Sequence, residues 1–422
     1  MKKMIDIKKC VKLAKNTTSY LKSLREILIK NRFTVNELKK YTGKEVVRYT
    51  SLFSNDQEFL QNQVFYGNEN LLTIVELFLL NKQVPSKKIL KLFDKHLIKN
   101  LIKIGILQNI NNKDKIYRSS VCLTPVSKNF YFNEGEIYAK YNFSKSKIIN
   151  PKTSDPLNVY FIAMEQPYLL SVFSLIESLN PNIKCEKILD ICCGSGVLGL
   201  SLGNSESQIY GVDLNPRATF FSELNSIFNS KKGKFINSNA TKIWPKKEKF
   251  DLIVSNPPFN GFVDLDKKTS KRARLPLHAG NFGDALTRPI LNNISNFLSE
   301  KGIFCIISSW LLKNNLPAYE MIKFMMENGT VILFHKPIVK ADTWEGLRQL
   351  YWAENISKFK AGYLKNLIKN SDFDSVTWGV LCWLKNKGPR GFHLIENTAT
   401  DRQLISASAK SKFHAIFKKK LY

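Results

Sequence analysis

The chain has 422 residues, enough for about two or three domains, and its 44% hydrophobic content can fill a sizeable core. Seven cysteines without a Cys-x-x-Cys pair argue against a disulfide framework and a zinc site, and we expect no bound metal. The longest apolar run, residues 71–80, is too short to cross a membrane and contains Glu76. We therefore expect a cytoplasmic protein that does not bind membranes.

The chain is strongly basic, with a formal net charge of +29. Such a charge favours a polyanionic partner such as nucleic acid. Because lysine, asparagine and isoleucine are all abundant, the excess is equally consistent with a solvated, lysine-rich surface. The first 150 residues are the more basic part of the chain, with 28 lysine and arginine residues against 12 acidic ones.

Residues 1–150 are predicted to form a mainly helical domain. An apolar helix is expected over residues 71–81, and a second helical segment opens at Pro85 and breaks near Asp94. A strand-rich piece follows at residues 115–132. Helices followed by a β-ribbon are the order of a winged-helix domain, so we predict a winged-helix-like unit that recognises the substrate.

The third helix of that unit would carry a polar face on its outer side, made of Lys95, His96, Lys99, Asn100 and Lys103. Such a face could read a nucleic-acid groove. Winged helices also serve as packing or docking modules with a solvated lysine face, and both interpretations stay open. Residues 133–155 are polar and turn-rich, which is typical of a linker.

From residue 156 onward, predicted strands and helices alternate, as they do in a doubly wound parallel sheet. The expected strands are 187–193, 208–214, 234–240, 250–256, 302–310, 330–336 and 375–386. Helices are expected at 197–204, 215–229 and 285–299. Residues 151–422 are thus predicted to be one α/β domain with a seven-stranded, Rossmann-like sheet and an insertion at 338–374. Right-handed crossovers would bring the carboxyl ends of the strands to one ligand-binding edge.

The first of these strands leads into Gly194-Ser-Gly196-Val-Leu-Gly199, a turn that lets a ligand approach the main chain. The following helix offers free N–H groups to an anionic group. Asp213, at the end of the second strand, can accept hydrogen bonds from ribose hydroxyls. NAD and S-adenosylmethionine both fit this pattern. A carboxylate at Asp190, just before the turn, favours the cationic sulfonium cofactor over a pyrophosphate.

The fourth strand runs directly into Asn256-Pro257-Pro258-Phe259. Two prolines make a rigid turn that is poor in N–H donors, so the Asn256 side-chain oxygen and the Pro257 carbonyl can face one point. Together they could bind both hydrogens of a planar –NH2 group and stabilise the positive charge that develops as its nitrogen attacks a methyl carbon. Phe259 offers a face for stacking a base or an amide. A structural turn without chemistry is the alternative.

Residues 187–310 resemble class I S-adenosylmethionine-dependent methyltransferases of the amino-methylating group. That group includes release-factor glutamine, adenine-N6 DNA and ribosomal guanine-N2 methyltransferases, and its small-domain members resemble the stretch 278–291. The resemblance rests on Asp190-x-Cys-Cys-Gly194-x-Gly196, on Asp213, on Asn225 in the next helix and on the Asn256-Pro-Pro-Phe259 motif.

The resemblance implies S-adenosylmethionine as the cofactor and a doubly wound methyltransferase sheet. By family analogy the cofactor residues are Asp190, Cys192, Gly194, Gly196, Asp213, Leu214, Asn239, Ala240 and Asn256. Asp190 and Gly194 would lie near the methionine end, Asp213 on the ribose and Asn239 near the adenine. Asn239 departs from the acid that the family often has there. The catalytic residues would be Asn256, Pro257, Pro258 and Phe259.

Two segments could choose the methyl acceptor. The loop after Phe259 carries five cations that could hold a phosphate backbone or form a solvated surface, namely Lys267, Lys268, Lys271, Arg272 and Arg274. His278 follows them and is a further candidate. In the insertion, Trp344 and Arg348 could wall the pocket or pack against the sheet.

The combined pattern predicts methyl transfer to a planar amino or amide nitrogen. A nucleic-acid base, in RNA or DNA, is the leading acceptor class. A protein glutamine, a peptide or a small molecule is the alternative. A further alternative is a non-catalytic winged-helix adaptor with a retired methyltransferase fold, against which the intact Asp190, Asp213 and Asn256 argue.

Overall fold

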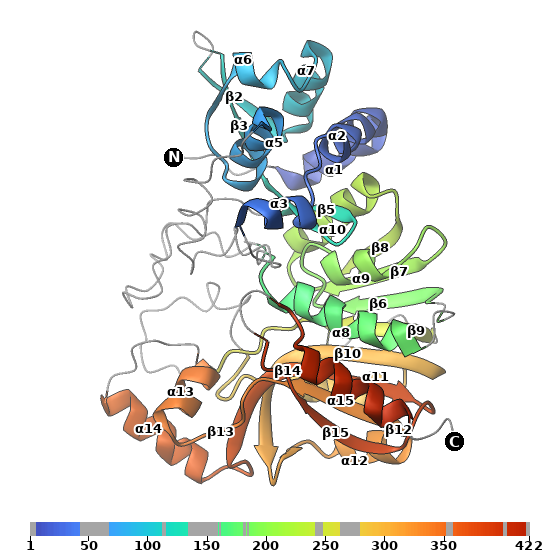
Figure 1. The fold of residues 1–422 in the computed structure, drawn as a ribbon, viewed down its shortest axis with the longest axis vertical. Helices are drawn as coiled ribbons and strands as arrows, with labels where there is room; N and C mark the ends of the chain where they lie inside the picture. Colours follow the sequence, from blue (N-terminus) through green and yellow to red (C-terminus); the bar gives the residue numbers. More distant parts are fainter. Residues whose placement is uncertain are drawn as a thin grey trace.

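A central twisted sheet with helices on both faces forms the larger part of the computed structural model (Figure 1). The structure describes residues 6–42, 67–111, 115–133, 159, 162–179, 183, 185–240, 248–261, 279–351, 358–399 and 403–418. The main strands are β6 (Lys187–Ile191), β7 (Gln208–Asp213), β8 (Lys232–Asn237), β9 (Phe250–Ser255), β10 (Leu298–Lys313), β12 (Gly329–His335), β14 (Ser375–Lys385) and β15 (Gly391–Glu396).

The strands follow the spatial order β15-β12-β14-β10-β9-β6-β7-β8. Short strands β11 (Leu316–Pro317) and β13 (Val339–Lys340) pair with β10 and β14. All seven predicted strands are present, so the doubly wound α/β prediction is confirmed. Strand β15, which pairs with β12, is an addition that the sequence did not predict.

Strand β14 corrects one expectation, because it runs antiparallel to both of its neighbours, β10 and β12. The alternation of strands and helices in the sequence predicts a crossover at each step and a parallel strand after it. The insertion explains the difference: β13 lies at its start and pairs Val339 with Val376 of β14. The chain thus re-enters the sheet from the edge where β12 ended, and such a return gives an antiparallel pair.

Alternate residues of the strands feed two cores on opposite faces of the sheet. Ile303 and Cys305 of β10 pack with helices α8 (Glu165–Leu179), α9 (Val197–Leu202) and α15 (Ala407–Lys418). Phe304 and Ile306 pack with α11 (Thr287–Ile294) and α12 (Met321–Glu327) on the other face.

The helix predicted over 285–299 is shorter than expected, because α11 ends at Ile294 and β10 begins at Leu298. Leu298 pairs with Phe250 of β9 before a register shift that leads to Ile303. The hydrophobic residues of 297–299 therefore pair with the sheet instead of extending the helix. The insertion 338–374 contains two helices, α13 (Trp344–Tyr351) and α14 (Lys358–Lys369).

The first third of the chain is mainly helical. Its elements are α1 (Ile7–Asn16), α2 (Thr18–Lys30), α3 (Val35–Thr42), α5 (Glu69–Ile74), the π-helical turn η2 (Val75–Leu79), β1 (Val84–Pro85), α6 (Ser86–Ile89), α7 (Lys95–Ile104), β2 (Leu107–Asn111) and β3 (Ile116–Ser119). Strands β1, β3 and β2 form a small sheet, and Asp94 caps α7 by accepting a hydrogen bond from Leu97 N. The winged-helix interpretation and the domain boundary at residue 150 stay predictions, and the linker at 133–155 lies almost wholly outside the described residues.

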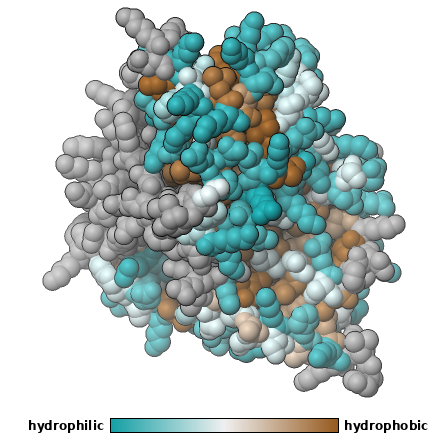
Figure 2. Space-filling view, turned by 45° about the horizontal axis from the view of Figure 1, so that its top comes forward, coloured by the Kyte–Doolittle hydropathy of each residue, from teal (hydrophilic) through white to brown (hydrophobic). Residues whose placement is uncertain are grey.

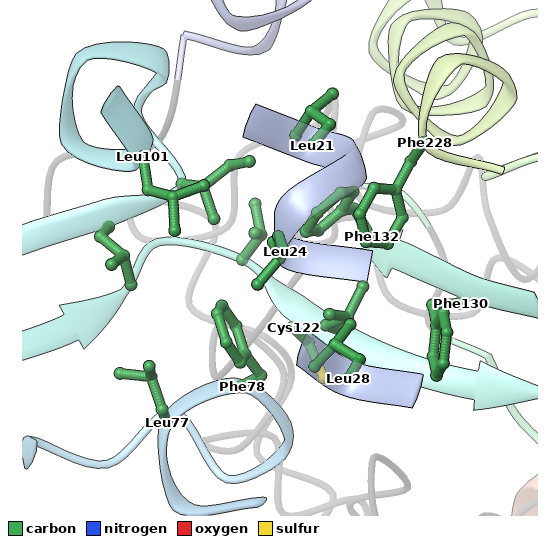
Figure 3. Packing of buried hydrophobic residues seen from close by; sticks show 14 of the residues in the cluster. Leu21, Leu24, Leu28, Leu77, Phe78, Leu101, Cys122, Phe130, Phe132 and Phe228 are labelled. Atoms are coloured by element: carbon green, nitrogen blue, oxygen red, sulfur yellow. The ribbon is translucent and has the colours of Figure 1, made fainter. Parts of the chain in front are cut away.

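A hairpin of β4 (Cys122–Val126) and β5 (Asn129–Asn133) follows this part of the chain. One hydrophobic core joins the hairpin and the N-terminal helices to helix α10 (Pro216–Phe228). Figure 3 shows Leu24 of α2 near Phe132 and Leu28 of the same helix near Cys122. The ring centroids of Phe132 and Phe228 are 4.6 Å apart. The N-terminal part is therefore packed against a helix of the α/β sheet.

None of the helices that the structure describes is both long and apolar enough to cross a membrane.

Candidate functional site

The turn between β6 and α9 presents bare backbone. Cys192, Gly194 and Gly196 have φ of 58°, 55° and 78°, in the left-handed region that favours glycine. A Cβ built on Gly194 meets nothing within 4 Å, so the chain faces open space there. A Cβ on Gly196 would lie 3.0 Å from the side chains of Leu200 and Ser222. The first glycine thus leaves room for a ligand, and the second allows close packing on α10.

Asp213, at the end of β7, holds this turn in place. Its Oδ2 accepts a hydrogen bond from Gly194 N at 2.9 Å, and its Oδ1 accepts one from Asn215 N at 2.8 Å. Burial raises the pKa of Asp213, against the two N–H groups that lower it. The neighbouring Leu214 is 55% exposed. A carboxylate beside an exposed apolar side chain fits a ribose joined to an adenine.

Asp190 lies beneath the turn, where it is 1% exposed. Its Oδ2 accepts a hydrogen bond from Gly199 N at 2.9 Å, while its Oδ1 is buried without a hydrogen-bond partner. Burial raises the pKa of Asp190 well above its ordinary value, and the nearby Asp213 raises it further. A cationic ligand bound above the turn, such as the sulfonium cofactor, would favour the ionised form of this buried carboxyl.

The other predicted cofactor residues lie near the same sheet edge. Cys192 is half-buried in the turn, and burial raises the pKa of its thiol well above the usual range. Asp213 pairs with Asn237, the last residue of β8. Asn239 and Ala240 come just after this strand end, on the side of the sheet edge where Asp213 lies. The Asn237 side chain also donates hydrogen bonds to the carbonyls of Asp213 and Leu214, a contact that sequence reasoning missed.

Asn256 leaves β9 next to the glycine turn. Ser255 pairs with Ile191 of β6, and its hydroxyl donates a 2.9 Å hydrogen bond to the Ile191 carbonyl. Asn256 and Cys192 therefore leave two adjacent parallel strands at the same level. The Asn256 side chain is half-buried. This register brings the two predicted motifs to one place.

The segment that follows the motif is clamped by backbone contacts. Gly261 N donates to Leu350 O of α13 at 2.8 Å, and Ala279 N donates to Asn260 O at 3.0 Å. A Cβ built on Gly283 would lie 2.1 Å from the Phe259 carbonyl oxygen. The insertion thus touches the segment directly after the predicted catalytic residues, through a helix end.

The remaining catalytic candidates differ in exposure. Pro257 is buried, Pro258 is half-buried, and Phe259 is 7% exposed within a core cluster. The stacking role of Phe259 stays a prediction. Trp344 is 45% exposed and Arg348 is exposed on α13, whereas Leu347 and Leu350 of that helix are buried.

Six predicted acceptor-binding residues lie outside the described residues: Lys267, Lys268, Lys271, Arg272, Arg274 and His278. The described part of the chain contains no group of three or more metal-ligating side chains suited to a metal ion.

One buried carboxyl was missed by sequence reasoning. Glu165 opens α8, is 5% exposed, and has an Oε2 atom without a hydrogen-bond partner. Burial raises its pKa from 4.5 to about 7. The Tyr168 hydroxyl, one turn later, donates to Phe334 O near the end of β12, which places this end of α8 at the carboxyl edge of the sheet. A glutamate at a helix start carries no sequence signal of such burial.

Comparisons with known proteins agree with this geometry. Residues 172–273 match the family model described as "Methyltransferase small domain", which confirms the predicted resemblance over that part of the chain. A release factor glutamine methyltransferase of Borreliella burgdorferi is 34% identical over 137 residues, covering 31% of this chain and 47% of that protein. The chain therefore spans about half the length of this relative.

A release factor glutamine methyltransferase of Fusobacterium nucleatum is 26% identical over 274 residues, covering 60% of this chain and 72% of that protein. Among solved structures, the methyltransferase subunit of a type I restriction-modification system from Streptococcus thermophilus is similar with a TM-score of 0.37 and 16% identity. That similarity covers 62% of this chain and 52% of the solved one. A TM-score this low supports no inference about function.

Proposed function

We propose that this chain, whose residues 172–273 carry a methyltransferase small domain, transfers a methyl group from S-adenosylmethionine to a planar amide or amino nitrogen. One observation carries the proposal: Ser255 pairs with Ile191, so Asn256 and the glycine turn leave adjacent strands side by side. A cofactor held at the turn and an acceptor held at Asn256 would then be neighbours. Proximity of this kind is a large part of catalysis of a bimolecular reaction.

The cofactor would be held by residues at the ends of β6 and β7. The backbone at Gly194 faces open space, Asp213 offers a carboxylate to the ribose, and Leu214 offers an apolar surface to the adenine. The unpartnered oxygen of Asp190 favours the positive end of the molecule. S-adenosylmethionine supplies an electrophilic methyl group on a sulfonium sulfur when it is bound.

Asn256 and Pro257 would position the acceptor nitrogen. The Asn256 side-chain oxygen and the Pro257 carbonyl would each accept one N–H of the acceptor, and neither Pro257 nor Pro258 adds an N–H donor to the turn. Binding both hydrogens fixes the direction of the nitrogen lone pair and stabilises positive charge on the nitrogen as it reacts. No strong base is required, because the proton leaves only after the nitrogen has become more acidic.

We place a protein glutamine side chain first among the acceptors. Relatives named as release factor glutamine methyltransferases support this choice, which reverses the order that the sequence favoured. A glutamine carboxamide has the planar –NH2 group that the Asn256 turn is suited to bind.

A nucleic-acid base is the second candidate, and one observation favours it. Lys95, Lys99 and Lys103 are exposed on α7 at four-residue spacing, and the helix itself contains no acidic residue. Residues four apart lie on one helix face, so these lysines form a basic stripe suited to phosphates. Figure 2 shows a largely hydrophilic surface with separate apolar patches on this side of the molecule.

Asn256→Ala tests the catalytic part of the proposal. We expect the turnover number to fall about 100-fold or more, since the variant loses the side-chain oxygen whose hydrogen bond stabilises the transition state. The dissociation constant of S-adenosylmethionine, measured by calorimetry, should change little. Full turnover by the variant would contradict the proposed role of Asn256.

Methyl labelling of a cell lysate separates the acceptor classes. The full chain is incubated with lysate and tritiated S-adenosylmethionine, and samples are then digested with nuclease or with protease. Loss of macromolecular label with protease alone supports the glutamine acceptor. Loss with nuclease alone moves the acceptor to nucleic acid, and no incorporation by a chain that binds the cofactor supports the adaptor alternative.

A further inference from the structure

Strand β5 faces helix α10 along the edge that β4 leaves open. Phe132 N donates to Asn225 Oδ1 at 2.7 Å, and Asn225 Nδ2 donates to Phe132 O at 2.9 Å. Asn229, at the end of α10, repeats this pattern with Phe130, at 3.1 and 2.8 Å. Each carboxamide therefore pairs with the N–H and the carbonyl of one strand residue, as a neighbouring strand would.

The two spacings explain why a helix can pair with a strand here. Four residues of a helix rise about 6 Å, and two residues of a strand span about 6.6 Å. Asn225 and Asn229 on α10 therefore match Phe130 and Phe132, whose outward backbone groups lie on the same edge of β5.

Asn225 also reaches the glycine turn. Besides the two hydrogen bonds with Phe132, the side chain makes a third, in which Nδ2 donates to Ser195 O at 2.9 Å. The side chain is 0% exposed. One turn earlier on α10, the Ser222 hydroxyl donates to Gly194 O at 2.9 Å. Among the described residues, the Ser222 side chain thus bonds to the glycine turn and the Asn229 side chain bonds to β5. The Asn225 side chain bonds to both.

We propose that Asn225 is a positioning residue that links the docking of β5 to the shape of the Gly194-Ser195-Gly196 turn. This inference rests on the proposed function, because it takes that turn as the cofactor site. The placement of the N-terminal unit on α10 then sets the affinity for S-adenosylmethionine.

The physical basis is the planarity of the carboxamide. The two hydrogens of Asn225 Nδ2 are divided between Phe132 O and Ser195 O. The pair of bonds to Phe132 fixes the plane of the amide, and that plane aims the second hydrogen at Ser195 O. Without β5, the amide is free to rotate and Ser195 O loses a fixed donor.

A second contact also connects β5 to the region of the glycine turn. The Tyr131 hydroxyl of β5 lies 2.6 Å from Ser201 Oγ on α9, the helix that follows the turn. Linkage makes the coupling reciprocal: if docking of β5 tightens cofactor binding, the cofactor tightens docking by the same factor.

Calorimetry of the full chain with S-adenosylmethionine tests the inference. Asn225→Ala should raise the dissociation constant about tenfold, the effect of losing a buried hydrogen bond that orders the site. Asn229→Ala is the matched control, because it also removes three side-chain hydrogen bonds, two to β5 and one to Asn225 O, but none to the turn. We expect the control to lower the melting temperature as much as Asn225→Ala does, and to change the dissociation constant less than twofold.

Hydrogen exchange supplies a readout that does not need the cofactor. In the free protein, Asn225→Ala should speed exchange in the peptide 193–200 more than Asn229→Ala does. In the wild type, S-adenosylmethionine should slow exchange at Phe132 N and leave Ile98 N unchanged.

The outcomes separate the two proposals. Equal dissociation constants and equal exchange in 193–200 for Asn225→Ala and Asn229→Ala would overturn the positioning role. A wild-type chain that does not bind S-adenosylmethionine would overturn the proposed function, while the exchange comparison would still decide the role of Asn225.

Discussion

The two turns of the candidate site lie on adjacent strands but are held in different ways. The glycine turn after β6 has main-chain hydrogen bonds from Cys193 N and Gly196 N, and it is held in addition by three side chains, Asp213, Ser222 and Asn225. The segment after Asn256 is fixed by main-chain contacts at Asn260 and Gly261. A single substitution can remove a side-chain contact. A main-chain contact persists through most substitutions and is lost only where the new side chain clashes with the main chain.

This difference predicts separable effects on binding and on turnover. Substitutions around the glycine turn should change cofactor affinity in small steps. Substitutions around the Asn256 segment should leave affinity unchanged and either do little or stop the reaction.

Gly283→Ala should have the largest effect. Its φ is +84°, and a Cβ there would lie 2.1 Å from the Phe259 carbonyl oxygen, so the main chain of the catalytic segment must move. A displacement of about 1 Å can cost about 100-fold in rate. We expect at least that loss of turnover with an unchanged dissociation constant for S-adenosylmethionine.

Gly362→Ala is the control for this substitution, because a Cβ at Gly362 on α14 meets nothing within 4 Å. It should retain wild-type turnover. A Gly283→Ala variant as active as Gly362→Ala would show that the segment after Asn256 does not need its observed path.

Asp213→Asn should have an intermediate effect, a rise of about tenfold in the cofactor dissociation constant. The pKa of Asp213 is raised above 3.8 by burial, and ribose hydroxyls bind best to the ionised form. Protonation therefore weakens binding as the pH falls through that raised pKa. The variant cannot ionise at this position, so calorimetry from pH 7 downward should show this part of the pH dependence only in the wild type.

The pH dependence of Asp213 can be separated from that of the rest of the site. Asp190, whose pKa is raised well above the ordinary value, remains in the variant, and any residual pH dependence reports on it. Residues 256–261 contain no ionisable side chain, so the rate at saturating cofactor should not follow the Asp213 titration. A wild-type dissociation constant that stays flat down to low pH would contradict the role of the Asp213 carboxylate.

Glu165→Gln should have the smallest effect on the two turns and act on stability instead. Burial raises the pKa of Glu165 from 4.5 to about 7, so the folded protein holds this proton more tightly than the unfolded chain. The stabilisation is complete below pH 4.5 and is lost as the pH rises through about 7. Glutamine avoids that loss, which amounts to about 3 kcal/mol at most.

Thermal melts of wild type and Glu165→Gln at pH 5 and pH 9 check this prediction. The variant should melt higher at pH 9 and much closer to the wild type at pH 5, with cofactor affinity unchanged. Weaker cofactor binding by the variant would instead assign Glu165 to the glycine turn.

The sequence was sufficient to predict the elements and their order around the site. Strong local signals made this possible: the glycines at 194 and 196 follow a buried strand, and two prolines end the strand before Phe259. The predicted strand ends at Asp213 and Asn256 agree with β7 and β9 to within a residue or two.

The contacts that join distant parts of the chain could not be predicted. Asn225 and Phe132 are 93 positions apart, and an asparagine within a helix gives no sign of its partner. The direction of β14 depends on where the insertion packs, which hydrophobic periodicity does not encode. The depth of Glu165 depends in the same way on residues from other elements.

The carboxamides of α10 have a consequence for solubility. A strand edge with unpaired N–H and carbonyl groups is a template for another chain, and proteins protect such edges. Asn225 and Asn229 occupy the outer backbone groups of β5 at Phe130 and Phe132, so the hairpin offers no free docking ladder there. Replacing both asparagines at once would leave the N–H and carbonyl groups of Phe130 and Phe132 without these partners. We expect the protein to self-associate at high concentration as a result.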